Sequence, residues 1–153
     1  MSNINRLPVK NYTLRDLRVA AQTAEACGYF DLATQLRGLH NIRLMIEPQP
    51  APVNTEESKE VTVDVDEAMY PRAARLLRER KAFGLRKYGT PLKTFNGRDP
   101  RVDELQELLD AQCYRAQGAM EGRGVGIVGA YLPKIEELAR DIESTFRNQD
   151  QEI

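Results

Sequence analysis

Apolar residues recur every three or four positions in two stretches near the start of the chain, which is the spacing of a helix with one buried face. The first stretch follows Thr13 and Asp16, a pair typical of a helix start, so a helix is expected over residues 13–27. A second helix is expected after Asp31, which can serve as its cap. The apolar positions of the two helices are Leu14, Leu17, Ala20, Ala21, Ala24, Leu32, Leu36, Leu39 and Leu44. Residues 1–46 therefore predict a helical hairpin.

The composition changes after this hairpin. Residues 47–60 hold three prolines, several acids and almost no bulky side chain, which is typical of a linker. Val61, Val63 and Val65 then alternate with polar residues and predict either a short strand or the extended entry to a helix. We expect the rest of the chain, residues 61–153, to form a second, helical domain.

Three further helices are predicted in this second domain, beginning at Asp66 or Pro71, at Pro100 and at Pro133. Asp99, which precedes one of these prolines, is a suitable helix cap. The helices are expected over about residues 66–87, 100–121 and 133–146, and the last one carries Ile135, Leu138, Ala139, Ile142 and Phe146 on one face. Since every confident element is helical, the predicted fold class is all-α, with the later helices packed as a bundle behind the N-terminal hairpin.

Composition excludes several classes of protein. The chain has 153 residues, of which 41% are hydrophobic and 29% charged, and no apolar run approaches the ~18 residues of a membrane span. It begins without an export signal, so we expect a cytoplasmic protein that makes no membrane contact. The net charge of -1 gives no reason to expect nucleic-acid binding.

The cysteines and the histidine offer little chemistry. Cys27, Cys113 and His40 are too few for a disulfide framework or a zinc site of ordinary spacing. We expect both thiols to be buried and His40 to lie at a helix end or in solvent.

Local charge is strongly graded between residues 72 and 98, where Glu79 is the only acid among nine basic residues. These are Arg72, Arg75, Arg78, Arg80, Lys81, Arg86, Lys87, Lys93 and Arg98. The next helix reverses the sign with Asp103, Glu104, Glu107 and Asp110. Either the two charged faces form ion pairs with each other, or they share a site.

The acidic residues are spaced for a metal ion. Asp103, Glu107 and Asp110 lie at i, i+4 and i+7 on one side of a helix, with Tyr114 continuing the row. Such a row repels itself unless a cation neutralises it, and Mg²⁺ suits carboxylate oxygens and phosphate exchange. Glu79 flanks an apolar stripe that we expect to face inward, where an unpaired carboxylate would be costly. A shared metal would satisfy all of these groups.

Phosphate and base contacts are expected from the basic helix and the loop after it. Lys87, Lys93 and Arg98 can hold the phosphate oxygens that such a metal bridges. Tyr88 and Phe95 can either stack on a base or anchor a core.

The run RERKAFGLRKYGTPLKTFNGRDPRVDELQELLDAQCYRAQ resembles the MazG-like nucleotide pyrophosphohydrolases of phages and bacteria, members of the all-α NTP pyrophosphatase superfamily. The resemblance spans about residues 66–121, and it is carried by Lys87-Tyr88-Gly89, by Asn96-Gly97-Arg98-Asp99, and by Glu107-Leu-Leu-Asp110 with Tyr114. In that superfamily a Glu-x-x-Asp pair and a Glu-Glu-x-x-Glu motif on the preceding helix bind Mg²⁺. Glu107 and Asp110 match the pair, and Glu79 is the only residue available for the upstream motif.

The resemblance implies Mg²⁺-dependent hydrolysis of a nucleoside triphosphate to the monophosphate and pyrophosphate, in a bacterial or phage-infected cytoplasm. The expected catalytic residues are Glu79, Glu107 and Asp110; the metal ligands are these with Asp103; the nucleotide contacts are Lys87, Tyr88, Lys93, Asn96 and Arg98. Two alternatives stay open: a nucleotide-binding protein without hydrolysis, and a helical protein-interaction module.

A homo-oligomer, at least a dimer, is also expected. The three helices of the second domain are too few to cover their apolar residues from water. In members of the superfamily that this chain resembles, two protomers complete a bundle.

Overall fold

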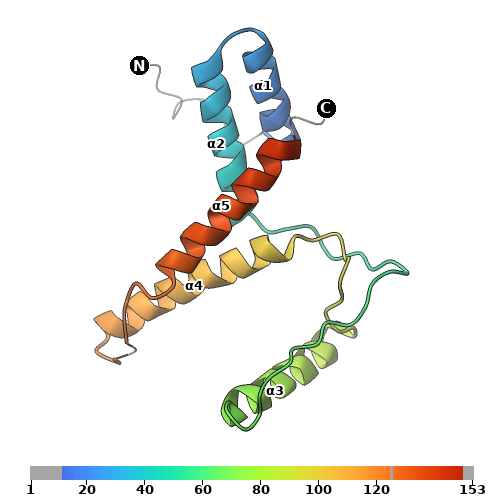
Figure 1. The fold of residues 1–153 in the computed structure, drawn as a ribbon, viewed down its shortest axis with the longest axis vertical. Coiled ribbons are helices and arrows are strands. Elements are labelled where there is room, and N and C mark those ends of the chain that lie inside the picture. The colour runs from blue at the N-terminus through green and yellow to red at the C-terminus, as the bar shows by residue number, and fades with distance from the viewer. Residues whose placement is uncertain (1–11, 125, 150–153) are drawn as a thin grey trace. The chain divides into compact units, whose positions relative to one another are not determined.

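The computed structural model describes residues 12–124 and 126–149, with side chains as far as Thr145. The described residues form five helices: α1 (Leu14–Ala26), α2 (Phe30–Ile46), α3 (Pro71–Tyr88), α4 (Pro100–Met120) and α5 (Leu132–Gln149) (Figure 1). Within these residues the only β-type pairing is an isolated bridge between Glu60 and Lys93. The predicted all-α class is confirmed. None of the described helices is long and apolar enough to cross a membrane.

Local sequence signals account for several of the helix ends. Thr13 caps α1 in a capping box: the Asp16 N–H donates to Thr13 Oγ1 (3.1 Å) and the Thr13 N–H donates to Asp16 Oδ2 (2.8 Å). Gly89 ends α3 in the left-handed conformation, with φ 72°. The predicted cap of α2 was wrong: Tyr29 occupies that position without a side-chain hydrogen bond, and Asp31 lies inside the first turn.

The described chain divides into two compact units. One unit contains the described residues up to Gln49 and from Asp99 onward, and the other is Pro50–Arg98. These boundaries differ from the predicted division into residues 1–46 and 61–153. The physical reason is that α2 and α4 share apolar contacts, which group α4 and α5 with the hairpin.

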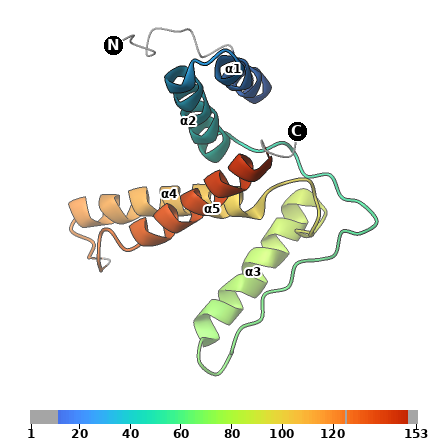
Figure 2. The same cartoon turned by 45° about the horizontal axis from the view of Figure 1, so that its top comes forward.

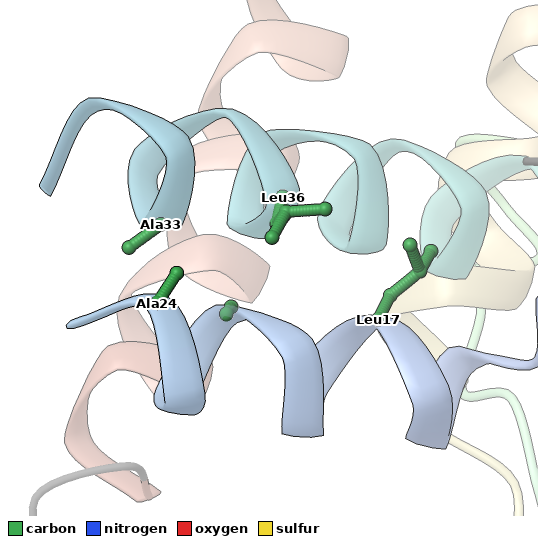
Figure 3. Packing of buried hydrophobic residues seen from close by; sticks show 5 residues of the cluster. Leu17, Ala24, Ala33 and Leu36 are labelled. Atoms are coloured by element: carbon green, nitrogen blue, oxygen red, sulfur yellow. The ribbon is translucent and has the colours of Figure 1, made fainter. Parts of the chain in front are cut away.

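The hairpin has its own small core. Leu17, Ala21 and Ala24 of α1 pack against Ala33 and Leu36 of α2, and all five side chains are buried (Figure 3). Alanine at three of these positions lets the two helices approach closely, so the hairpin is tight but buries little apolar volume.

A second core joins α4 and α5, which run side by side (Figures 1 and 2). Val102 and Leu105 of α4 pack against Leu138 and Ile142 of α5, and Met45 from the end of α2 completes the cluster. Ile142 is fully buried, as the predicted apolar face of α5 requires. Phe146 was predicted on the same face, and its side chain lies outside the described residues.

The segment predicted as a linker is hydrogen-bonded in the Pro50–Arg98 unit. The Val53 N–H donates to the Asn96 carbonyl (2.8 Å), and the Thr94 N–H donates to the Lys59 carbonyl (2.8 Å). The Val61 N–H donates to the Leu92 carbonyl (2.9 Å), so two extended segments pair in opposite directions. Residues 61–65 form no strand, and the extended entry to α3 makes only this short pairing.

The same extended chain runs along α3 (Figures 1 and 2) and is tied to it by charge. Arg78 pairs with Glu67 at 2.8 Å, and Lys81 pairs with Glu60. In this unit, whose residues are all described, the buried side chains are Ala74 and Asn96. Leu76 is 67% exposed, so the apolar stripe expected to face inward is largely uncovered in the single chain.

Two predictions about single residues were wrong. Cys27 and Cys113 are exposed; Cys27 lies in the turn after α1, and Cys113 lies on α4 beyond its last buried residue, Leu105. His40 is buried inside α2, where its Nδ1 lies 3.1 Å from Asn41 Oδ1.

Candidate functional site

Glu107 and Asp110 lie one turn apart on the exposed side of α4. Helical spacing puts Val102 and Leu105 on the other side, where they pack into the α4–α5 core. Tyr114 continues the exposed row and is 68% exposed. The packing of α4 therefore presents the predicted carboxylate pair to solvent.

This pair has no local counter-ion. Neither Glu107 nor Asp110 has a basic residue three or four positions away on the helix. Within the part of the chain that the structure describes, neither carboxylate takes part in a hydrogen bond or ion pair. Two like charges one turn apart destabilise a helix slightly, and a bound cation would remove that cost.

Asp103, the first carboxylate of the row, is held more firmly. It is partly buried, and its Oδ1 accepts a hydrogen bond from Gln49 Nε2 (2.8 Å). Gln49 also joins both backbone groups of Asp99: its Nε2 donates to the Asp99 carbonyl (2.8 Å) and its Oε1 accepts from the Asp99 N–H (2.8 Å). Sequence reasoning missed Gln49, because a lone glutamine among prolines carries no local signal.

The start of α4 is fixed by Asp99 and Arg101. Asp99 Oδ1 accepts from the Arg101 N–H (2.9 Å), and Asp99 Oδ2 accepts from Arg101 Nη2 (2.8 Å). This hydrogen bonding to Arg101 lowers the pKa of the Asp99 carboxyl below its ordinary value. Arg101 Nη1 donates in turn to Thr145 Oγ1 (2.9 Å), so the helix that carries the carboxylates is tied to α5.

Glu79 is exposed on α3, in the Pro50–Arg98 unit, whereas Glu107 and Asp110 belong to the other unit. Its neighbour Arg78 is engaged by Glu67 through an exposed ion pair that lowers the pKa of Glu67 and raises that of Arg78. Glu79 takes part in no hydrogen bond or ion pair with any described residue. Glu79, the predicted third acid, is therefore an exposed carboxylate on α3.

Lys87 and Tyr88 form a contact at the end of α3. Lys87 Nζ lies 5.0 Å from the centre of the Tyr88 ring, and both side chains are exposed. The helix dipole favours a cation in the last turn, so the charge of Lys87 stabilises the end of α3 without an acidic partner.

The predicted loop residues mainly hold the loop itself. Asn96 is buried, and its Oδ1 accepts from the Arg98 N–H (3.1 Å). Arg98 Nη1 donates to the Pro50 carbonyl (2.8 Å), and Lys93 is partly buried at the bridge to Glu60. These contacts give Asn96 and Arg98 structural roles in addition to the proposed nucleotide contacts.

Two of the seven basic residues of α3, Arg78 and Lys81, pair with acids of the extended segment. The others make no ion pair with the residues described; they are Arg72, Arg75, Arg80, Arg86 and Lys87. One helix therefore retains a strong positive charge that can attract an anionic ligand.

Over residues 12–124 and 126–149, no three His, Cys, Asp or Glu side chains gather as a metal-binding group. Glu107 and Asp110 by themselves make a two-carboxylate arrangement. No protein-family model, curated protein or solved structure matches this chain.

Proposed function

We propose that this protein is a Mg²⁺-dependent nucleotide pyrophosphohydrolase, which converts a ribo- or deoxyribonucleoside triphosphate to the monophosphate and pyrophosphate. The observation that carries the proposal is the Glu107–Asp110 pair, which is exposed on α4 and has no counter-ion among the described residues. The resemblance to MazG-like enzymes adds the reaction, since these two residues match the Glu-x-x-Asp pair of that superfamily.

The donor set suits magnesium. Mg²⁺ is commonly held by one or two carboxylates and keeps several coordination positions for water and substrate phosphate oxygens. Glu107 and Asp110 supply the two carboxylates, while Asp103 and Glu79 are further oxygen donors in the proposal. The ion would neutralise the phosphate charge and orient a water.

In the proposed reaction the water oxygen attacks the α-phosphorus. The bond from this phosphorus to the oxygen that bridges to the β-phosphate breaks, and pyrophosphate leaves with that oxygen. A carboxylate takes up the proton of the attacking water, and Glu79 is the proposed candidate because it is the only residue available for the superfamily's upstream motif. Lys87, at the end of α3, and Arg98 stabilise charge on the phosphate oxygens. Lys93 and Asn96 lie in the same loop as Arg98 and are further candidates for nucleotide contacts.

We also propose that the active form is a homodimer or a larger homo-oligomer. The Pro50–Arg98 unit buries one apolar side chain, Ala74, whereas Leu76 is 67% and Phe83 48% exposed. A second copy of the chain is the proposed cover for these side chains. The proposal places the protein in the cytoplasm, where nucleoside triphosphates occur.

A nucleotide-binding protein without hydrolysis is the second candidate. Glu79 is the single acid of α3, where the superfamily has a motif of three glutamates. Loss of ligands would weaken metal activation of the water more than it weakens phosphate binding by the basic residues.

The purified protein should be incubated with each common NTP and dNTP, with and without Mg²⁺, while pyrophosphate release and the thermal unfolding midpoint are measured. Pyrophosphate that requires Mg²⁺ supports the enzyme, and a raised midpoint without product supports the binding protein. If neither changes, both proposals fail and the interaction module is the remaining interpretation.

The matched variants are Asp110→Asn and Glu107→Gln, which remove charge but keep size. Each should abolish the Mg²⁺-dependent signal and leave the fold intact, since removing one of two repelling charges does not destabilise α4. Unfolding of either variant would instead assign the acidic row to a structural ion-pair network.

A further inference from the structure

Phe95 and Asn96 reverse the usual order of burial. Phe95 is 72% exposed, whereas the neighbouring Asn96 is only 9% exposed. Phenylalanine is ordinarily among the most buried residue types and asparagine among the more exposed ones. The loop therefore anchors itself through a polar side chain and leaves its aromatic ring in solvent.

The backbone at Phe95 is also unusual. Among the described residues, Phe95 is the only non-glycine with a positive φ, at 49°. This left-handed conformation is uncommon for a bulky residue and costs free energy that the surrounding structure must supply. A glycine or an asparagine would adopt it more easily.

Hydrogen bonds hold the loop in this conformation. Ser58 Oγ donates to the Phe95 carbonyl (3.2 Å), and the Val53 N–H donates to the Asn96 carbonyl (2.8 Å). The Lys59 N–H donates to Thr94 Oγ1 (3.0 Å) just before the ring. The exposed ring therefore stands on a backbone that is fixed on both sides.

We propose that Phe95 is the surface on which the nucleobase of the bound nucleotide stacks; this inference rests on the proposed function. An exposed aromatic ring on a fixed backbone gives stacking energy without the cost of ordering the loop on binding. Lys93 and Arg98, in the same loop, are candidates for the phosphates of the same ligand. Since every base has a π-face, a stacking platform also predicts weak discrimination between bases.

The test compares Mg²⁺–ATP with Mg²⁺–tripolyphosphate, which has the phosphates but no base, in binding experiments on the full chain. Phe95→Leu should weaken ATP binding about 5- to 150-fold, the range for loss of one base–aromatic stack, and leave tripolyphosphate binding unchanged. Phe95→Tyr should bind ATP like the wild type. Phe30→Leu is the matched control, because Phe30 is 65% exposed in the hairpin and has no proposed role.

A second variant separates a binding role from a structural one. Phe95→Asn should raise the thermal unfolding midpoint by about 2–4 °C, since asparagine tolerates the left-handed backbone, and should still lose ATP affinity. A residue retained for folding would give the opposite change in the midpoint.

If the wild type binds ATP, three results would overturn the inference. Two are unchanged ATP binding by Phe95→Leu and equal losses of affinity for ATP and tripolyphosphate. The third is a difference in mass between Phe95→Leu and the wild type by light scattering, which would assign the ring to a contact between protein chains. Failure of the wild type to bind either ligand would refute the proposed function itself, and the stacking role with it. Loss confined to ATP supports the platform.

Discussion

Replacing Asp99 by alanine tests how the helix that carries the carboxylate pair is held. Asp99 caps α4 by accepting from the Arg101 N–H, and its carboxylate also pairs with the Arg101 guanidinium at 2.8 Å. Alanine removes both interactions. The substitution keeps the hydrogen bonds between the Gln49 side chain and residue 99, because these use the main-chain N–H and carbonyl of residue 99.

The size of the effect follows from these two interactions. Loss of an N-cap costs about 1 kcal/mol of unfolding free energy. The ion pair has side chains 35% and 27% exposed, so we expect it to add only about 0.5 kcal/mol. Asp99→Ala should therefore lose about 1.5 kcal/mol at pH 7, and Asp99→Asn, which can still cap, about 0.5 kcal/mol.

The loss should depend on pH in a defined direction. Hydrogen bonding to Arg101 lowers the pKa of Asp99 below 3.8 in the folded protein. A carboxyl with a lowered folded-state pKa stabilises the protein fully above its unfolded pKa, and that contribution disappears as the pH falls through the folded value. The gap between wild type and Asp99→Ala should be constant from about pH 5 to 7 and narrow steadily below pH 3.8.

Urea denaturation at several pH values measures this gap directly. An Asp99→Ala protein as stable as the wild type at pH 7 would refute the cap. A gap that stays constant down to pH 3 would refute the role of the ionised carboxylate.

Three further predictions concern the α4–α5 core, the two thiols and the hydrogen bonds of Gln49 to α4. Ile142→Ala should cost about 2–5 kcal/mol in denaturation, because Ile142 is fully buried, and a loss below 1 kcal/mol would contradict the α4–α5 core. Cys27 and Cys113 should both react with a thiol reagent in the native protein, since both are exposed, and protection of either would contradict its placement. Gln49→Ala should lower the free energy of unfolding by about 1–3 kcal/mol, because three hydrogen bonds of 2.8 Å are lost. An unchanged free energy of unfolding would show that these bonds to Asp99 and Asp103 do not stabilise the protein.

The sequence predicted those parts of the fold that depend on local signals. The capping box at Thr13 and the Asp99–Pro100 start of α4 both lie where the pattern placed them, and α3 ends one residue beyond the predicted residue 87. Each of these helix starts relies on contacts between residues a few positions apart, so the local sequence determines it.

The sequence did not predict features that depend on distant contacts. Gln49 reaches residues 99 and 103, about fifty positions away, and nothing near Gln49 indicates these partners. The pairing of Val53 with Asn96 likewise turns an apparent linker into part of a compact unit. Burial of His40 depends on the packing around α2, which the spacing of leucines does not fix.

The candidate site was predictable to a similar extent. Helical periodicity placed Glu107 and Asp110 on one side of a helix, and in the structure both are exposed on α4. It could not assign Asn96 to the interior of its loop or Phe95 to its surface, because this order reverses ordinary preferences. The metal and the reaction stay predictions.

The most direct test of the central claim is ³¹P NMR of a nucleoside triphosphate incubated with the protein and Mg²⁺. We predict resonances of the monophosphate and pyrophosphate, which disappear when Asp110→Asn replaces the wild type. Formation of the diphosphate and inorganic phosphate, or equal turnover by wild type and Asp110→Asn, would contradict hydrolysis directed by the α4 carboxylates.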